Sequence, residues 1–514
     1  MATTHPETAI SLACLLLAGG CALPAAQAQT QTTKIQPTLD LQVLSTDNVN
    51  AAASGPRQSD VITTATAGVN VKAKGANATL EGQYRLSAVN YANGTQPDRI
   101  LPSGALNLHT DILRQGVGLD ANVSSEQVQA NFNNATTSSS TPNTANTYTN
   151  TRYGLSPYIS RPLDADTHVE ARLGRTWLKS SQNSTALAAR PNSYADDHRL
   201  LLTRRPTRIG YELDADYQTT HISGQSDPSL TQKSGKASVL YALSPELEVG
   251  LTAGRESTQV LTRKLDDTIR GARFQWRPGE RTLLKAQVED RFFGKAWQVE
   301  ATHRSPWLAL GFSSRRQPET YTSSLGTWQA GSSMQSLYDA MLTTRITNPV
   351  ERKNAVADLI ASRNLPTTIG STRDAYDLGA VLRETTTGRL AVMGRRDVLT
   401  LSAGLNRSHP LLIDSTVSLL PPPRTKEYFF DTQLNHRLTP LSTISGGLRW
   451  SRAVNTPDGQ APILSRDFSW RATFNTALSS DATASMGLKH QISHTPSTTS
   501  SDESSMFVGL GYRF

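Results

Sequence analysis

The sequence has little cysteine, few charged residues and no apolar run of transmembrane-helix length. Both of its cysteines, Cys14 and Cys21, stand near the beginning of the 514-residue chain. A large exported chain often relies on disulfides, so a chain whose remaining length has no cysteine must find its stability in another way. The lack of long apolar runs excludes a helical membrane protein, because a spanning helix needs about 20 consecutive apolar residues.

The overall balance of residues is polar but does not point to nucleic acid. Hydrophobic residues make up 37% and charged residues 18% of the chain, and the formal charge of +8 is spread along it without a Lys/Arg block. We therefore expect no nucleic-acid partner. The same balance is compatible with a membrane barrel, in which one strand face meets lipid and the other meets water.

The N-terminal residues resemble a secretory signal. Residues 10–18 are apolar, and a small-x-small site at Ala26 and Ala28 follows. This pattern predicts a signal peptide over residues 1–28, cleaved after Ala28, and therefore an exported protein. The alternative is a lipoprotein signal in which Cys21 is acylated rather than removed.

The C-terminal residues alternate in the manner of a strand between lipid and water. Residues on one face of a strand recur at every second position. The apolar face of the last segment consists of Met506, Val508, Leu510, Tyr512 and Phe514. The opposite face holds Phe507, two glycines and Arg513. Val508, Leu510, Tyr512 and Phe514 resemble the sorting signal that the barrel-assembly machinery of the outer membrane recognises, which predicts a Gram-negative outer-membrane protein.

Similar alternation recurs along the chain, for example at residues 211–217, 247–253, 444–450 and 470–478. Short turns at 163–167, 243–247, 438–442 and 478–482 contrast with polar loops at 124–150, 180–194 and 455–462. Together they predict an all-β, transmembrane, antiparallel up-and-down barrel over residues 29–514, with about 22 strands (16 to 24 accepted) and periplasmic short turns. Residues 383–396 are ambiguous and affect the count. We expect a monomer surrounded by outer-membrane lipid and lipopolysaccharide.

One segment has helical instead of alternating periodicity. Within residues 317–371, apolar positions recur at helical spacing over 333–345 and 350–363, and Pro349 suits the first turn of the second helix. Three interpretations are open: a hairpin packed on a loop or strand wall, a plug or constriction in the lumen, or a docking site for a partner. The plug hypothesis assigns the constriction to Leu337, Tyr338, Met341, Val350 and Leu359.

Two groups of residues resemble a known family. The blocks LSTDNVN at 44–50, QSDVI at 58–62, GQYRL at 82–86 and YAN at 91–93 are similar to PEP-CTERM system-associated outer-membrane proteins, as is NPVER at 348–352 followed by Leu365 and Pro366. These are β-barrel porins found beside exopolysaccharide export genes. The resemblance implies a barrel that works with an exosortase and exopolysaccharide system. It implies no catalytic residues.

The chain shows no motif for enzymatic chemistry. It has no Gly-x-Ser-x-Gly elbow, no His-Glu-x-x-His helix and no phosphate-binding loop. His198 follows Asp197, but neighbours on a strand point apart, so we interpret it as a solvated residue at the end of a loop. Asp214 and Asp216 suggest either calcium binding or, more simply, solvated lumenal acids. We therefore expect no enzyme, no cofactor and no metal.

The face opposite the apolar one carries many charged residues. Those that we predict to line a pore are Arg172, Glu212, Asp214, Asp216, Arg273, Lys285, Arg291, Arg304, Arg437, Arg449, Arg471, Lys489 and Arg513. One interpretation is a mixed ionic network that braces the barrel wall. The other is a hydrated path for an anionic or sugar solute, in which arginine forks hold carboxylates and Phe293 stacks on sugar rings.

These observations predict a porin-like outer-membrane barrel linked to exopolysaccharide export or surface assembly, with exopolysaccharide or its export proteins as partners. The alternatives are a general solute porin and a structural or adhesive surface barrel without transport. A lipase or protease ranks last.

Overall fold

The computed structural model describes residues 32–50, 56–113, 116–129, 147–183, 190–224, 228–260, 262–320, 322, 334–343, 345–346, 348–363, 365, 380–411, 423–457, 459–495 and 498–514. The expected signal peptide, its cleavage site and Cys21 lie outside these residues.

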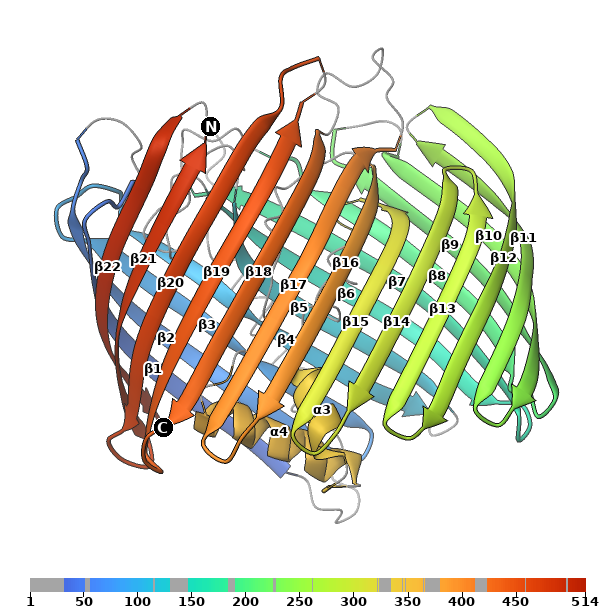
Figure 1. Cartoon of the computed structure of the whole chain (residues 1–514), viewed down its shortest axis with the longest axis horizontal. Helices are drawn as coiled ribbons and strands as arrows, with labels where there is room; N and C mark the ends of the chain where they lie inside the picture. The colour runs from blue at the N-terminus through green and yellow to red at the C-terminus, as the bar shows by residue number, and fades with distance from the viewer. Residues whose placement is uncertain are drawn as a thin grey trace.

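Twenty-two strands form one closed antiparallel sheet (Figure 1). Each strand pairs with its neighbours in the sequence, and β1 pairs with β22 through nine residue pairs, from Thr38 with Arg513 to Thr46 with Ser505. The strands are β1 Thr32–Thr46, β2 Asp60–Lys74, β3 Ala78–Tyr91, β4 Arg99–Leu113, β5 Val117–Gln129, β6 Thr147–Pro162, β7 Thr167–Gln182, β8 Ser193–Arg204, β9 Ile209–Ile222, β10 Leu230–Ser244, β11 Leu247–Val260, β12 Arg263–Gly279, β13 Thr282–Arg291, β14 Gly294–Arg304, β15 Leu308–Glu319, β16 Val381–Met393, β17 Asp397–Pro410, β18 Arg424–Arg437, β19 Ser442–Thr456, β20 Ile463–Ala477, β21 Ala482–Thr495 and β22 Thr498–Arg513. The predicted barrel and its strand number are confirmed, and the ambiguous residues 383–396 belong to β16 and the turn after it.

The two ends of the barrel differ in the length of their connections. Each even-numbered strand is joined to the next strand by a short turn, and these turns share one end of the barrel with the C-terminus (Figure 1). The predicted short turns at 163–167, 243–247, 438–442 and 478–482 all lie there. The contrast is incomplete at the other end, because β13 and β14 are joined there by only Phe292 and Phe293. Phe293 is therefore a rim residue in the turn between β13 and β14 and not part of a strand face.

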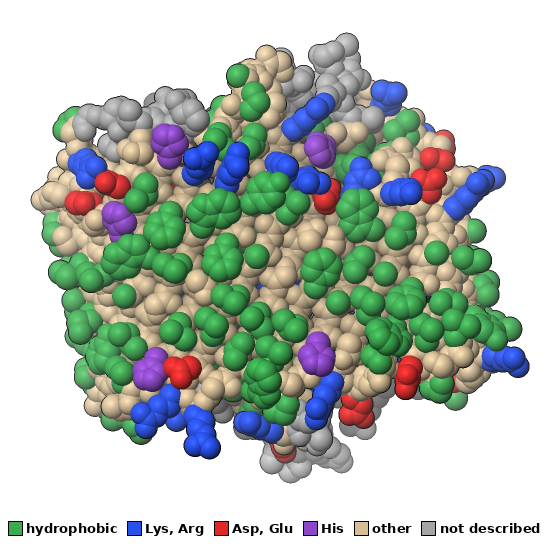
Figure 2. All heavy atoms as spheres, viewed as in Figure 1, with side chains coloured by type: hydrophobic (Ala, Val, Ile, Leu, Met, Phe, Trp, Pro, Cys, Tyr) green, Lys and Arg blue, Asp and Glu red, His purple; other side chains and the backbone are tan. Residues whose placement is uncertain are grey.

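The outer face of the barrel is apolar. Side chains at every second position, such as Val239 and Leu251, are exposed, Leu251 by 72%. Figure 2 shows apolar side chains around the waist and charged ones toward both ends. Aromatic side chains on this face gather near the strand ends, with Trp276, Tyr241 and Tyr512 toward the short turns and Trp177, Tyr217 and Tyr428 toward the other end. Such girdles mark the two membrane interfaces of a barrel.

Two helices, α3 (Gln335–Leu342) and α4 (Pro349–Arg363), lie between β15 and β16 in the sequence. The N-terminus of α4 follows from its sequence. The backbone N–H of Glu351 donates to the side-chain oxygen of Asn348 at 3.4 Å, and Pro349 occupies the first helical position. Among the described residues, no helix is long and apolar enough to cross a membrane.

Candidate functional site

The helix pair packs against the inner wall of the barrel near the short turns. Met334, Leu337, Tyr338 and Met341 join one apolar cluster with Ala309, Ala391 and Val398, which lie on β15, β16 and β17. Small wall residues leave room for these side chains, and Leu337 lies 3.4 Å from the position that a β-carbon on Gly311 would occupy. Figure 1 shows both helices at the short-turn end of the barrel, beside β15–β17.

The side chain of Lys353, on α4, reaches a second and distant part of the wall. Its Nζ lies 2.6 and 2.8 Å from the two carboxylate oxygens of Glu81 on β3. Glu81 faces inward, because the register of β2 and β3 sets it opposite Lys72 on the face shared by Thr38 and Gly68. In a ring of 22 strands, β3 lies far from β15–β17. The helix pair therefore extends across the lumen from one wall to another.

The two helices are also joined to each other. The Nε of Arg352 donates to Asp339 at 2.8 Å, and its Nη1 donates to the carbonyl of Ile346 at 3.1 Å. The guanidinium therefore joins α4 to α3 and to the segment between them.

The residues that the plug hypothesis singled out differ in how they lie. Leu337, Tyr338 and Met341 are almost fully buried in the cluster, and Leu359 packs against its edge. Val350 belongs to α4, but its side chain is outside the described part. Burial raises the pKa of the Tyr338 phenol, which therefore stays neutral.

Sequence reasoning missed Val356, a core residue of the same cluster. Val356 and Leu359 are three residues apart, which is a helical spacing, so the apolar periodicity of α4 could have identified Val356 as a core residue.

The chain that leaves β15 turns inward before it reaches the helices. The hydroxyls of Thr320 and Thr220 lie 2.9 Å apart, and those of Thr322 and Ser193 lie 2.7 Å apart. Thr220 and Ser193 belong to β9 and β8, which are six and seven strands away from β15. The insertion is thus attached to the wall at both ends of the barrel.

All thirteen residues predicted to line a pore occupy inward-facing positions of the register. On β7–β9 they form ion pairs between strands. Arg172 lies 2.5 Å from Asp120, and the Nε of Arg199 lies 3.0 Å from Asp214 and 3.6 Å from Asp216.

The pairing continues on β10–β13. Lys236 lies 3.6 Å from Asp214 and 3.9 Å from Glu289. Arg273 reaches Glu212 at 2.7 Å, and the Nε of Arg291 donates to Glu256 at 2.8 Å. This part of the wall is a mixed ionic network.

The remaining members of the predicted lining lie apart from this network. Arg437 and Arg513 end β18 and β22 at the short-turn end, and Arg304 donates to the carbonyl of Glu280 in a short turn. Lys285 stands opposite Glu300 on the next strand. Arg449, Arg471 and Lys489 face the lumen from the middle of β19, β20 and β21.

Two interpretations of single residues are wrong. His198 lies within β8, which begins at Ser193, and stacks on the outward-facing ring of Tyr217 with 5.6 Å between centroids. Asp214 is nearly buried and ion-paired instead of solvated. Within the described part of the chain, no three His, Cys, Asp or Glu side chains come together to hold a metal ion.

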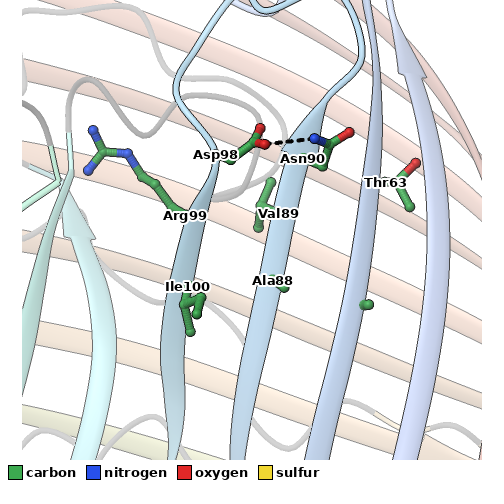
Figure 3. A pocket seen from close by; sticks show the side chains of 8 residues that line it. Thr63, Ala88, Val89, Asn90, Asp98, Arg99 and Ile100 are labelled. Carbon is green, nitrogen blue, oxygen red and sulfur yellow. Dashed lines mark hydrogen bonds between the residues drawn. The ribbon is translucent and has the colours of Figure 1, made fainter. Parts of the chain in front are cut away.

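A separate hollow of about 390 Å³ lies on β2–β4 (Figure 3). Its lining includes Thr63, Ala65, Ala88 and Ile100, which face outward, and a hydrogen bond of 2.8 Å joins Asn90 to Asp98 at its edge. Most of its lining residues face outward, near the end of the barrel opposite the short turns.

A closed antiparallel barrel with an apolar belt between two aromatic girdles and a charged interior is an outer-membrane β-barrel. This chain belongs to that structural class, and the predicted outer-membrane location is confirmed at this level.

No protein-family model and no curated protein matches the sequence. One similar solved structure is a mutant of the ferric enterobactin receptor PfeA from Pseudomonas aeruginosa with enterobactin, with 10% sequence identity and a TM-score of 0.46 over 95% of this chain and 82% of that one. Another is the ferric-catecholate import receptor Fiu from E. coli K12, with 8% identity and a TM-score of 0.47 over 95% of this chain and 82% of that one. The copper transporter OprC is also similar, with 8% sequence identity and a TM-score of 0.37 over 94% of this chain and 81% of that one. At these values the similarity identifies no cargo for this chain.

Proposed function

We propose that this chain is an outer-membrane pore that α3 and α4 obstruct at the periplasmic end, and that it serves the export of an exopolysaccharide. The observation that supports the obstruction is the contact of one helix pair with two distant walls, through the cluster around Leu337 and through the Lys353–Glu81 ion pair. The short turns face the periplasm in barrels of this class. A solute would therefore meet the helices as it enters from the periplasm.

The link to exopolysaccharide is supported by where the family-like residues lie. Residues 82–86 directly follow Glu81 on β3, and residues 348–352 directly precede Lys353 on α4. Two of the blocks that resemble PEP-CTERM system-associated proteins thus flank the two partners of the contact across the lumen. The resemblance of both sides of this contact to the family is compatible with a role in polysaccharide export.

Single-channel conductance in a planar lipid bilayer tests the pore. The intact protein and a variant in which a short turn replaces residues 320–380 are compared under the same voltage. We expect little or intermittent conductance from the intact protein and a large steady conductance from the variant. Silence of both forms would refute the pore and favour a structural surface barrel.

The export role needs a separate measurement in the native cell. Deletion of the gene is expected to lower surface exopolysaccharide, and restored expression is expected to return it. Unchanged surface polysaccharide together with lost uptake of small solutes would instead indicate a general porin.

A further inference from the structure

The inner wall of β19–β22 has a diagonal row of three cations and one aromatic ring. The row consists of Arg449, Arg471, Lys489 and Phe507, one residue from each strand. The register sets Arg471 directly opposite Lys489. The ring of Phe507 lies over Gly487, because a β-carbon there would come within 2.6 Å of it, and the Nζ of Lys489 is 5.6 Å from the ring centroid.

This row has few carboxylates, unlike the ionic network on β7–β13. Arg449 lies 3.8 Å from Asp431. Arg471 donates to the neutral amide oxygen of Gln433 at 3.0 Å. Among the residues that the structure describes, neither Arg471 nor Lys489 has a carboxylate oxygen within 4.0 Å.

The direct pairing of Arg471 with Lys489 lowers stability, and the contacts with Gln433 and Phe507 do not remove the repulsion. Like charges directly opposite each other on neighbouring strands repel. Natural sequences accept such local conflicts mainly at functional sites. The Arg471 side chain is also exposed to the lumen, so its guanidinium is accessible to a solute.

We infer that Arg471, Lys489 and Phe507 form a binding subsite for a carboxylate-bearing sugar, the repeating unit of an acidic polysaccharide. A guanidinium binds a carboxylate through two parallel hydrogen bonds, and the ammonium adds a second positive charge. The ring of Phe507 offers an apolar surface to one face of a pyranose, as aromatic side chains do in ligand sites. This inference rests on the proposed polysaccharide export and specifies its substrate class.

The test is calorimetric titration of the intact, detergent-solubilised barrel with trigalacturonate, and with uncharged maltotriose for comparison. We expect heat of binding from trigalacturonate only. Arg471→Gln removes the charge-assisted hydrogen bonds and should weaken binding about tenfold or more. Lys285→Gln removes one lumenal charge from β13, across the lumen, and should leave the affinity unchanged. Slower migration of each variant after heating, in gel electrophoresis, verifies that the barrel is folded.

A second variant separates a sugar site from a simple anion site. Phe507→Leu should weaken the binding of trigalacturonate and leave the weaker binding of inorganic phosphate unchanged. Absence of trigalacturonate binding would overturn the inference, as would phosphate that binds equally tightly, or equal losses from Arg471→Gln and Lys285→Gln.

The titration does not depend on conductance. A barrel that binds trigalacturonate but never conducts would refute the pore and retain the subsite. A conducting barrel that binds no trigalacturonate would refute the subsite alone.

Discussion

Truncation of the apolar anchor of α3 should open the pore far more than loss of the ion pair across the lumen. Leu337 is only 5% exposed, and Leu337→Ala removes most of its packing against β15. Such a change costs about 2–5 kcal/mol, and the lower end applies here because one side of the cluster can relax. About 2 kcal/mol raises the ratio of displaced to seated helices roughly thirtyfold.

The ion pair contributes much less to the seated state. The side chains of Lys353 and Glu81 are 52% and 37% exposed, and exposed pairs contribute about 0.2–1 kcal/mol. Lys353→Gln should therefore raise the ratio about fivefold at most.

Single-channel recordings measure the difference as open probability at one voltage and salt concentration. We expect an order from the unaltered protein, through Lys353→Gln, to Leu337→Ala. Leu342→Ala serves as the matched control, because Leu342 belongs to the same helix but is only partly buried. The reasoning would be refuted if Lys353→Gln opened the pore as much as Leu337→Ala, or if Leu337→Ala had no effect on conductance.

Three further predictions concern the wall. Arg291→Gln leaves a buried lumenal carboxylate, Glu256, without its partner and should destabilise the barrel by about 3–5 kcal/mol. Loss of Lys264, whose pair with Asp266 is exposed on both sides, should change the stability far less, and equal shifts in the midpoint of heat-induced gel retardation would contradict this. Leu448→Arg, on the lipid face, should make the free energy of refolding into vesicles less favourable by about 2–4 kcal/mol. Leu478→Arg, in a turn, should change it by close to nothing, and a similar cost at both sites would show that the membrane surrounds a different part of the barrel. Deletion of Phe514 should lower the amount of barrel in outer-membrane fractions, and an unchanged amount would show that the C-terminal strand is not the sorting signal.

The faces of the strands were predictable from the sequence because the strand period is two. Once short turns fix where a strand begins, every second side chain faces the lumen, as Glu212, Asp214 and Asp216 do. The prediction failed only where a strand end was misplaced. His198, interpreted as a residue at the end of a loop, lies within β8, which begins at Ser193. Phe293, interpreted as a lumenal aromatic, lies in the turn that follows β13.

The contacts across the lumen were not predictable in the same way. Amphipathic spacing shows that Leu337 and Met341 share one side of a helix, but it does not show which wall that side meets. Lys353 and Glu81 are 272 positions apart, and no local pattern links them. The cations of β20 and β21 also needed the register, because only pairing shows that Arg471 faces Lys489 and not an acid.

The pairing of β15 with β16 makes the barrel wall independent of what fills it. Twelve residue pairs join these strands, from Leu308 with Val392 to Glu319 with Val381, and the insertion begins and ends beyond the last pair. Loop-closure entropy grows slowly, by about 0.6 kcal/mol for each doubling of length, so this connection tolerates large changes in length. Evolution can thus exchange or lengthen this segment as a module, and one barrel scaffold can acquire new obstructions without redesign of any strand.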